Sequence, residues 1–328
     1  MKIAVDIMGG DFGSLPLIEG ALMALKEYNF TLFLVGDEEI CKQCVPSSLH
    51  KKIQIIDCKD VITMEEGATS ALKRKDSSIY AAIEMLKNKE VDAVVSAGHS
   101  GATMSLATLK IGRLKGISRP AICALMPRID GNKSLVMDAG ANVDCKAENL
   151  LEFAIMGYEY ANIVLGYSQA RIGLLANGEE ECKGNETTKS AFELLKNHPN
   201  FIGNIEGNNI FDSSVEVIVC DGFVGNIVLK TSEGVADSIV NLLKQYTKSS
   251  PIGTFGALFM KSVFKKLKKQ IDYSEYGGAQ LLGVDGNVII CHGKSNAKAI
   301  KNAIFQAITA FQSNINHKIL QALQNHKT

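Results

Sequence analysis

The sequence has 328 residues, of which 46% are hydrophobic and 21% are charged. A chain of this length and composition can bury a large core, which excludes a mainly disordered protein. Lysine plus arginine and aspartate plus glutamate both number 35, so the chain lacks the basic excess of a general nucleic-acid binder and we expect no nucleic-acid partner.

The first residues do not resemble a targeting segment. Lys2 is followed by a short apolar run that ends at Asp6, whereas a secretory signal needs a longer apolar region and a small-residue cleavage site. No stretch approaches the ~18 consecutive apolar residues of a membrane-spanning helix. We therefore expect a cytosolic protein without a spanning segment.

Apolar runs alternate with segments of helical spacing along the chain. The runs predicted as strands are 2–7, 31–36, 53–57, 91–96, 134–138, 171–175 and 215–220. The helices predicted after them cover 15–27, 77–88, 100–111, the stretch after 138 to about 160, 186–197 and 223–245. Strands 281–284 and 287–291 with a tight turn at Asp285-Gly286 predict a hairpin, and a last helix is predicted over about 296–323.

This alternation predicts an α/β fold with a largely parallel sheet. Strands that are almost continuously apolar are typical of sheets covered by helices on both faces, and the hairpin makes the sheet mixed near the C-terminus. The sequence shows no internal repeat or low-complexity linker, so we predict one domain over 1–328. Ser249-Ser250-Pro251 introduces a different segment, and about 246–272 is predicted to project as an amphipathic helical segment.

Polar loops that contain glycine follow five of the predicted strands, at 6–11, 96–102, 138–142, 177–186 and 220–226. In doubly wound sheets, ligands bind beyond the carboxyl ends of the strands. Glycine lets the backbone approach an anion closely, and N–H groups at a helix start donate to it. A tight turn alone explains the glycines of any one loop, but five such loops together predict a shared cleft that binds phosphate.

Two nucleotide-binding motifs and one cysteine motif are incomplete. Residues 8–13 do not form GxGxxG, and the Gly293-Lys294-Ser295 end of a possible P-loop has Val288 where a glycine is required. Cys41 and Cys44 have CxxC spacing, but no second pair with zinc spacing follows. Metal or redox use of that pair is therefore the less favoured interpretation, and most of the eight cysteines are expected to be small buried hydrophobes.

Motifs over nearly the whole chain resemble the phosphate acyltransferases of bacterial phospholipid synthesis. The matching stretches are VDIMGGD (5–11), VSAGHSGA (95–102), DAGAN (138–142), GEEECKGNE (178–186), GNIEG (203–207), CDGFVGN (220–226), YGGAQLLGV (276–284) and the HG-x-S stretch 292–295. The second motif has His99 and Ser100 where that family usually has asparagine and threonine. Gln280 stands where it often has proline, a change expected to affect only loop stiffness.

The resemblance implies reversible transfer of a long-chain fatty acyl group from acyl-[acyl carrier protein] to inorganic phosphate. The products would be acyl phosphate and holo-acyl carrier protein, for phosphatidic acid and phospholipid synthesis. It also implies a Rossmann-like three-layer α/β/α fold related to phosphotransacetylases and isopropylmalate-type dehydrogenases. Finally, it implies a homodimer with no metal and no nucleotide cofactor.

Two residues are predicted to be catalytic. Lys183 lies in a strand-end loop with uncharged neighbours, and the resemblance assigns a catalytic lysine there; the alternative is a solvated loop lysine. Asn226 is expected to donate a hydrogen bond to the acyl carbonyl or to phosphate, again with support from the resemblance. Its alternative role is a helix N-cap, a position that asparagine favours.

Further contacts to phosphate or substrate are expected from the glycine-bearing loops and one histidine. They are Gly9, Gly10, Ser96, Gly98, His99, Ser100, Gly101, Asn142, Asn185, Gly222 and His292. His99 and His292 are expected either to donate to phosphate or to protonate the leaving thiolate; the alternative is a packed or capping histidine. The aspartates at 6, 11, 138 and 221 are expected to orient loops, because carboxylates repel phosphate.

The projecting segment has the composition of a membrane-interface helix. Five lysines follow between 261 and 269, and the apolar residues predicted to contact a membrane are Ile252, Phe255, Leu258, Phe259 and Val263. The resemblance implies peripheral association with the inner face of the cell membrane, close to a membrane-bound acyl phosphate:glycerol-3-phosphate acyltransferase. The alternatives are a helix packed on the core or on a second subunit, and lysines that attract the acidic acyl carrier protein.

Three rival functions stay open at this point. A short-chain phosphotransacetylase would use acyl-coenzyme A in place of acyl carrier protein. An isopropylmalate-type dehydrogenase would need a metal-binding aspartate cluster and a nicotinamide site. A catalytically silent scaffold would link fatty-acid synthesis to the membrane, although the complete loops around Lys183 and Asn226 argue against it.

Overall fold

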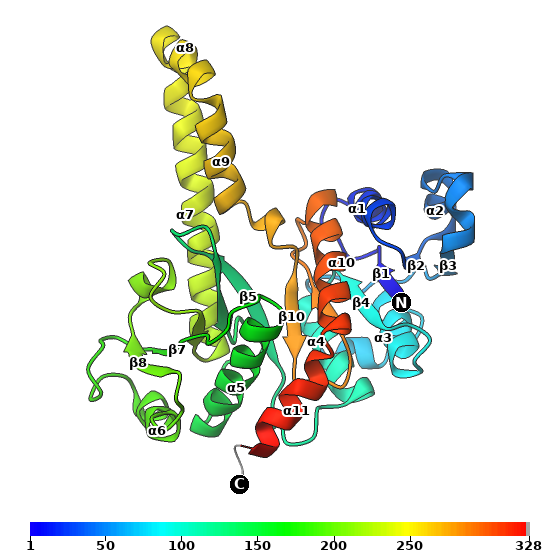
Figure 1. Ribbon diagram of the computed structural model, residues 1–328. Helices are drawn as coiled ribbons and strands as arrows, with labels where there is room; N and C mark the ends of the chain where they lie inside the picture. Colours follow the sequence, from blue (N-terminus) through cyan, green and yellow to red (C-terminus); the bar gives the residue numbers. More distant parts are fainter. Residues whose placement is uncertain (326–328) are drawn as a thin grey trace.

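One mixed sheet organises the protein, as seen in a computed structural model that describes residues 1–325 (Figure 1). Within these residues eleven strands lie in the order β3-β2-β1-β4-β11-β10-β5-β6-β9-β7-β8. Seven of the neighbouring pairs are parallel and three, all involving β10 or β5, are antiparallel. Helices cover both faces of this sheet. The predicted α/β fold class is therefore confirmed.

Five parallel strands form the N-terminal half of the sheet. They are β1 (Lys2–Asp6), β2 (Thr31–Gly36), β3 (Ile53–Asp57), β4 (Ala93–Ser96) and β11 (Val288–Ile290). Successive side chains point to opposite faces, so Ile3 and Val5 pack into one core cluster while Ala4 packs into another. The first cluster is covered by α1 (Ser14–Glu27), α2 (Glu38–Cys44) and α10 (Ala297–Gln312), and the second by α3 (Ser78–Lys87) and α4 (Ser100–Leu106).

The other half of the sheet runs in the opposite direction. Its parallel strands are β6 (Lys133–Met137), β9 (Val217–Val219), β7 (Ile172–Leu175) and β8 (Phe201–Ile205). β10 (Ala279–Leu282) and β5 (Ala121–Pro127) lie between the halves. Because β10 is antiparallel to β11 and β5, and β5 is antiparallel to β6, the direction reverses across the centre. The sequence analysis did not predict β5 or β8.

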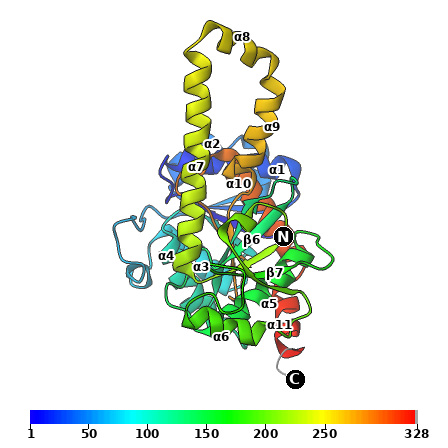
Figure 2. The same ribbon diagram turned by 90° about the vertical axis from the view of Figure 1, so that its left-hand side faces the viewer.

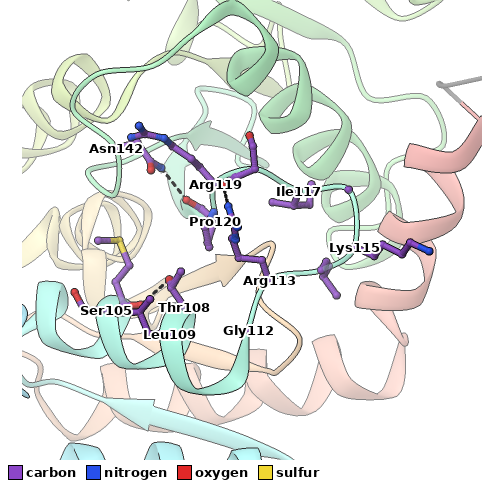
Figure 3. Close-up of a pocket in the computed structure, with 14 residues that line it drawn as sticks. Ser105, Thr108, Leu109, Gly112, Arg113, Lys115, Ile117, Arg119, Pro120 and Asn142 are labelled. Carbon is purple, nitrogen blue, oxygen red and sulfur yellow. Dashed lines mark hydrogen bonds between the residues drawn. The ribbon is translucent and has the colours of Figure 1, made fainter. Parts of the chain in front are cut away.

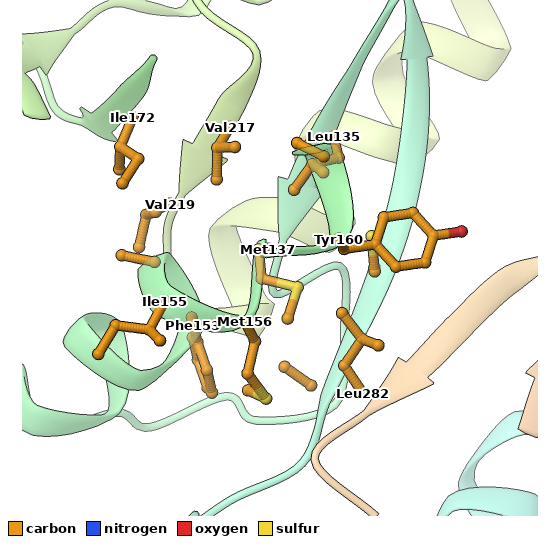
Figure 4. Packing of buried hydrophobic residues seen from close by; sticks show 14 of the residues in the cluster. Leu135, Met137, Phe153, Ile155, Met156, Tyr160, Ile172, Val217, Val219 and Leu282 are labelled. Atoms are coloured by element: carbon orange, nitrogen blue, oxygen red, sulfur yellow. The ribbon is translucent and has the colours of Figure 1, made fainter. Parts of the chain in front are cut away.

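One buried cluster joins the second half of the sheet to its helices (Figure 4). α5 (Ala147–Ile163), α6 (Glu186–Leu195) and α11 (Ile315–Asn325) cover this face. α5 packs closely on the strands at Gly157, where a Cβ atom would lie only 2.7 Å from Val217 Cγ1. The buried Tyr160 hydroxyl accepts a hydrogen bond of 2.8 Å from Gln306 Nε2, which links α5 to α10.

The C-terminal helical region differs from the single helix predicted over 296–323. It is divided at Asn314, which has a left-handed backbone (φ 54°), a conformation that asparagine tolerates better than most residues. α10 packs on α1, whereas Ile315 and Ile319 of α11 pack in the cluster around α5. The bend therefore lets one terminal segment cover both halves of the sheet.

The predicted C-terminal hairpin is present. β10 and β11 pair antiparallel, with Ala279 opposite Ile290, and residues 283–287 connect them. Gln280 is a buried strand residue and not part of a loop, so the expectation about loop stiffness was wrong. Its Nε2 donates a hydrogen bond of 2.9 Å to Asn287 Oδ1 inside the sheet centre.

A long helical hairpin projects from the sheet (Figures 1 and 2). It consists of α7 (Gly222–Lys248), α8 (Pro251–Phe259) and α9 (Lys261–Ile271), so the predicted basic helix is divided near Met260. The base of the hairpin is anchored through Gln270. Its side-chain Nε2 donates a hydrogen bond of 2.8 Å to the Arg128 carbonyl, and its backbone carbonyl accepts one of 2.6 Å from the Tyr276 hydroxyl. No helix within residues 1–325 has the length and apolar composition that a membrane span requires.

Candidate active site

A cleft of about 520 Å³ lies where the two halves of the sheet meet. Ile122 of β5 and Ala279 of β10 line it from the sheet. The N-terminal half contributes Ser100, and α7 contributes Asn226. His292 follows β11 into the same cleft. The cleft therefore collects polar side chains from segments far apart in the sequence.

The reversal of strand direction changes how the predicted shared cleft is built. The carboxyl ends of β4 and β6 point in opposite directions, yet Gly98 and Gly140 from the loops after these strands both line the cleft. The loop after β7, which carries Lys183, does not line it. The cleft is thus formed by loops from both ends of the sheet rather than by one row of strand ends.

The first two glycine loops pack backbone against backbone. A Cβ atom at Gly9 would lie 2.2 Å from the Gly98 Cα atom, so a side chain at position 9 would separate the loops. Below them the Ser96 hydroxyl donates 2.8 Å to the buried Asp6 carboxylate and accepts 3.1 Å from the Gly98 N–H. Burial raises the pKa of Asp6. Gly10 packs beside Leu17. These contacts order the wall of the cleft, which is the loop-orienting role expected for Asp6.

His99 uses both ring nitrogens within the protein. Nδ1 accepts a hydrogen bond of 3.1 Å from the Ala102 N–H and caps α4, which leaves Nε2 to donate 2.9 Å to the Glu66 carbonyl. Gly101 packs against Ala68, two residues after Glu66. A Cβ atom at Gly101 would lie 2.9 Å from the Ala68 Cβ atom. The contacts of His99 match the alternative in which it caps a helix. Ser100, the next residue, is exposed in the cleft.

The loop after β6 is organised by the buried Asp138 carboxylate. It accepts hydrogen bonds from the N–H groups of Gly140, Ala141 and Asn142 at 2.7 to 3.2 Å. The Asn142 side-chain amide donates 2.8 Å to Asp138 and 2.7 Å to the Pro120 carbonyl. Burial raises the pKa of Asp138 despite these bonds. Asn142 is thus occupied with holding the loop, and its predicted contact to substrate has no support in these bonds.

The start of α7 places Asn226 in the cleft. The helix is capped by Asp221, whose carboxylate accepts 2.8 Å from the Val224 N–H, so Asn226 is not the N-cap. Gly222 donates 2.7 Å from its backbone to the Asn142 carbonyl and is buried in that contact. The Asn226 side chain is exposed beside Gly140 and makes no hydrogen bond to any residue in the part of the chain that the structure describes.

Charged groups one turn further along α7 were not predicted. Lys230 lines the cleft four residues after Asn226 and pairs with Glu233 at 2.9 Å, and both face the cleft. Asp11 and Tyr276 also line it. The four-residue spacing from Asn226 along a helix was the signal that could have identified Lys230.

His292 lies in this charged surrounding. Its Nδ1 accepts 3.0 Å from the Lys294 N–H. Burial, followed by the positive charge of Lys230, lowers the pKa of His292 below its ordinary value. The next residue, Gly293, is fixed against Asp11, whose N–H donates 2.8 Å to the Gly293 carbonyl. A neutral imidazole that accepts at Nδ1 carries its proton on Nε2.

Lys183 and Asn185 occupy a separate loop. Lys183 is half-buried, its N–H donates 2.9 Å to the Glu180 carbonyl, and its aliphatic chain packs beside Gly178. The Asn185 side chain accepts 2.9 Å from the Thr188 N–H and caps α6. These two residues do not line the cleft that contains Asn226, so the catalytic role of Lys183 stays a prediction.

The described residues show neither a disulfide nor a metal-type cluster. All eight cysteines are free. Cys41 of the CxxC pair is buried, and burial raises its pKa to about 11, so it is a thiol at neutral pH. Within residues 1–325, no group of three or more His, Cys, Asp or Glu side chains is arranged to hold a metal ion.

Known structures with a similar fold identify the architectural class. A phosphotransacetylase from Streptococcus pyogenes has a TM-score of 0.61 at 20% identity, covering 96% of this chain and 94% of that chain. A branched-chain phosphotransacylase from Enterococcus faecalis V583 has a TM-score of 0.58 at 12% identity, covering 95% and 99%. A 4-hydroxythreonine-4-phosphate dehydrogenase from Klebsiella pneumoniae has a TM-score of 0.51 at 12% identity, covering 95% and 98%. The chain therefore shares its Rossmann-like α/β fold with these phosphotransacylases and this dehydrogenase.

Sequence comparisons identify the family. The family described as "Fatty acid synthesis protein" matches residues 1–318. Proteins named "Phosphate acyltransferase" from Wolinella succinogenes and Nitratiruptor sp. are 67% and 61% identical, each over 99% of this chain and 98% of the relative. One from Campylobacter concisus is 59% identical over 99% of both chains. The chain belongs to the phosphate acyltransferase family and is an acyltransferase, as the sequence motifs predicted.

Proposed function

We propose that the protein transfers a long-chain fatty acyl group from acyl-[acyl carrier protein] to inorganic phosphate. The products are acyl phosphate and holo-acyl carrier protein, for phosphatidic acid and phospholipid synthesis. The observation that carries the proposal is the Asn226 amide, which lies in the cleft without a hydrogen-bond partner among residues 1–325. Such a donor is available to a substrate oxygen.

The reaction needs positioning more than activation. A phosphate oxygen attacks the thioester carbonyl carbon, the C–O bond forms, the C–S bond breaks, and the proton of hydrogen phosphate ends on the released thiol. Holding two reactants together removes much of the entropic barrier, and a donor aimed at the developing oxyanion lowers the rest. Asn226 suits the oxyanion, Lys230 suits the phosphate charge, and neutral His292 suits transfer of the proton to sulfur.

The first experiment measures product by mass spectrometry, with palmitoyl-acyl carrier protein and inorganic phosphate as substrates. We expect acyl phosphate and holo-carrier, and a loss on the order of a hundredfold in kcat for Asn226→Ala, the usual effect of removing one oxyanion donor. Unfolding of this variant should match the wild type, because Asn226 does not cap α7. Asp221→Ala is the matched control, since it removes the cap and should cost about 1 kcal/mol of stability.

Two outcomes would redirect the assignment. Activity on acetyl-coenzyme A with none on palmitoyl-acyl carrier protein would favour the short-chain phosphotransacetylase. Reduction of a nicotinamide nucleotide without acyl phosphate would favour a dehydrogenase. Lys183→Ala belongs in the same assay: kcat/KM within a few-fold of the wild type would reject a catalytic Lys183 and leave the proposed reaction standing.

We also propose that the protein acts at the inner face of the cell membrane as a homodimer. The apolar side chains of α8 support the membrane contact, because Ile252 is 84% and Phe259 is 76% exposed. Phe255, Leu258 and Val263 are exposed with them on the same projecting hairpin. Acyl phosphate released there would lie close to a membrane-bound acyl phosphate:glycerol-3-phosphate acyltransferase.

A further inference from the structure

A second cavity, of about 830 Å³, is lined by the end of α4 and by residues 112–120 (Figure 3). The helix α4 passes along both this cavity and the cleft that contains Asn226: Ser100 at its start lines the cleft, whereas Ser105 and then Thr108, in the π-helical turn after α4, line the second cavity. At about 1.5 Å of rise per residue, Thr108 lies roughly 12 Å from Ser100. The loop after β6 also joins them, with Gly140 in the cleft and Asn142 in the second cavity.

The wall of the second cavity carries three cations, Arg113, Lys115 and Arg119, within seven residues of chain. All three are exposed, and within residues 1–325 none of them forms an ion pair with a carboxylate. The Arg113 guanidinium donates to the Ser118 carbonyl. Two acidic residues lie beside this loop. The Glu152 carboxylate accepts 2.8 Å from the Ser118 N–H and 2.6 Å from its hydroxyl, and the Asp285 N–H donates 3.0 Å to the Gly112 carbonyl.

Backbone hydrogen bonds tie this wall to the connection between β10 and β11. The Leu114 N–H donates 2.9 Å to the Gly283 carbonyl, and the Ile117 N–H donates 3.0 Å to the Leu114 carbonyl. Leu114 and Ile117 are buried. The backbone of the loop is therefore anchored, and the exposed cationic side chains project from it.

The place of the cavity indicates which part of a substrate it suits. Thioester donors that carry acyl groups on a carrier protein or on coenzyme A share a long phosphopantetheine arm. The thioester ends this arm, amide groups lie along it, and a phosphate lies at its far end. The cavity offers a hydroxyl at Ser105, which makes no hydrogen bond within the described residues, and guanidinium groups that bind phosphate well.

We propose that the second cavity binds the phosphopantetheine arm of the acyl-thioester donor, with Arg113 and Arg119 as the site for its phosphate and Lys115 further out on the same loop. The inference rests on the proposed function, because the cleft must hold the thioester when the arm occupies the cavity. It adds a cationic donor-binding loop that the motif residues do not include. Arginine at both positions of the phosphate site fits bidentate recognition of a phosphate.

The test compares donors with and without the phosphate. Arg113→Ala/Lys115→Ala/Arg119→Ala is assayed with S-octanoyl-phosphopantetheine and with S-octanoyl-pantetheine. Loss of charged hydrogen bonds should raise KM for the phosphorylated donor roughly tenfold or more, while KM for S-octanoyl-pantetheine and both kcat values stay unchanged. Lys51→Ala, an exposed lysine in the η1 turn (Ser47–Lys52) before β3, is the matched control and should behave as the wild type.

The alternatives give different patterns. Equal changes for the two octanoyl donors would overturn the phosphate site. A rise in KM for acyl-acyl carrier protein alone, with none for S-octanoyl-phosphopantetheine or acyl-coenzyme A, would assign the cations to the acidic surface of the carrier and also overturn it. If the wild type makes no acyl phosphate from any donor, the proposed function fails, and calorimetric titration of phosphopantetheine into wild type and triple variant still decides whether the cavity binds the arm.

Discussion

Gly225 decides how closely the start of α7 approaches the loop after β6. A Cβ atom at this position would lie 1.8 Å from the Asp138 carbonyl oxygen, which is backbone and cannot move independently. We predict that Gly225→Ala destabilises the protein by roughly 2–3 kcal/mol, because the helix must shift. The same shift displaces the neighbouring Asn226, so activity should fall as well. Urea unfolding and the acyl phosphate assay measure the two effects.

Gly234 supplies the control on the same helix. A Cβ atom there meets nothing within 4 Å. Gly234→Ala should therefore stabilise the protein by about 0.5–1 kcal/mol, since alanine is the better helix former. If both alanine variants change stability by the same amount, close packing at Gly225 is not the reason for its effect.

The histidine in the cleft gives a pH dependence with a definite sign. Burial and the positive charge of Lys230 lower the pKa of His292 below its ordinary 6.5. The charge of Lys294 also lowers this pKa, whereas the carboxylates of Glu233 and Asp11 raise it. Between the lowered pKa and 6.5, the unfolded chain binds a proton that the folded chain does not. The free energy of unfolding should therefore be intact above pH 6.5 and decrease as the pH falls below it.

His292→Gln isolates this contribution. The decrease in unfolding free energy between pH 7 and pH 5 should be smaller in the variant than in the wild type, as measured by urea unfolding at both pH values. An NMR titration of the His292 ring reports the pKa directly. A midpoint at or above 6.5 would contradict the prediction.

The motifs located the walls of the cleft better than they assigned roles within it. Ser96, His99 and Asn142 stand in loops that do form or border the cleft, but their polar atoms bind other parts of the protein. Motif patterns record which residues recur together and not which atom a side chain reaches. Lys230 was missed because no motif covers it, although it follows Asn226 by one helical turn.

At the scale of elements, the apolar tip of the helical hairpin predicts membrane binding. We expect Phe259→Glu to reduce pelleting with vesicles of phosphatidylglycerol and phosphatidylethanolamine at least tenfold in partition, because burial of a phenylalanine contributes roughly 1.5–3 kcal/mol. Phe311→Glu is the matched control, since that phenylalanine is also exposed but belongs to α10. Unchanged pelleting of Phe259→Glu would remove the membrane proposal.

Elements with a strong local pattern were predictable, and elements that depend on their neighbours were not. The continuous apolar runs of β1, β2 and β4 gave their positions from the sequence alone. β5 begins directly after Pro120 and ends at Pro127, so proline obscures its short apolar run. β8 contains Gly203 and Asn204, which are rare in strands, and pairing with β7 overrides that preference.

The reversal of the sheet is a property of the whole molecule. It is completed where β5 pairs antiparallel with β6. Between β5 and the first half lies β10, which comes from close to the C-terminus and runs antiparallel to both β11 and β5. Nothing in the local pattern of residues 279–282 specifies which distant strand they meet. The sequence therefore predicted the class of fold and most of the loops, while the arrangement of those loops around one cleft required the tertiary structure.

A second whole-molecule property is the apolar stripe on α7, formed by Val235, Ile239, Leu242 and Tyr246. The spacing of four, three and four residues places the four side chains on one face of the helix. The exposed fraction of these residues lies between 47% for Leu242 and 68% for Tyr246. The small apolar cavity inside the hairpin is lined by other α7 residues, including Val240 and Thr247, so α8 and α9 do not cover the stripe.

We expect this stripe to be the contact between two copies of the protein, because a two-fold dimer brings the same helix face together from both subunits. Leu242→Glu places a charge in the stripe and should convert the dimer to a monomer, which light scattering after size exclusion detects as a halved mass. Asn241→Glu adds the same charge beside the stripe and should leave the mass unchanged. A Leu242→Glu protein with the wild-type mass would place any dimer contact elsewhere on the surface.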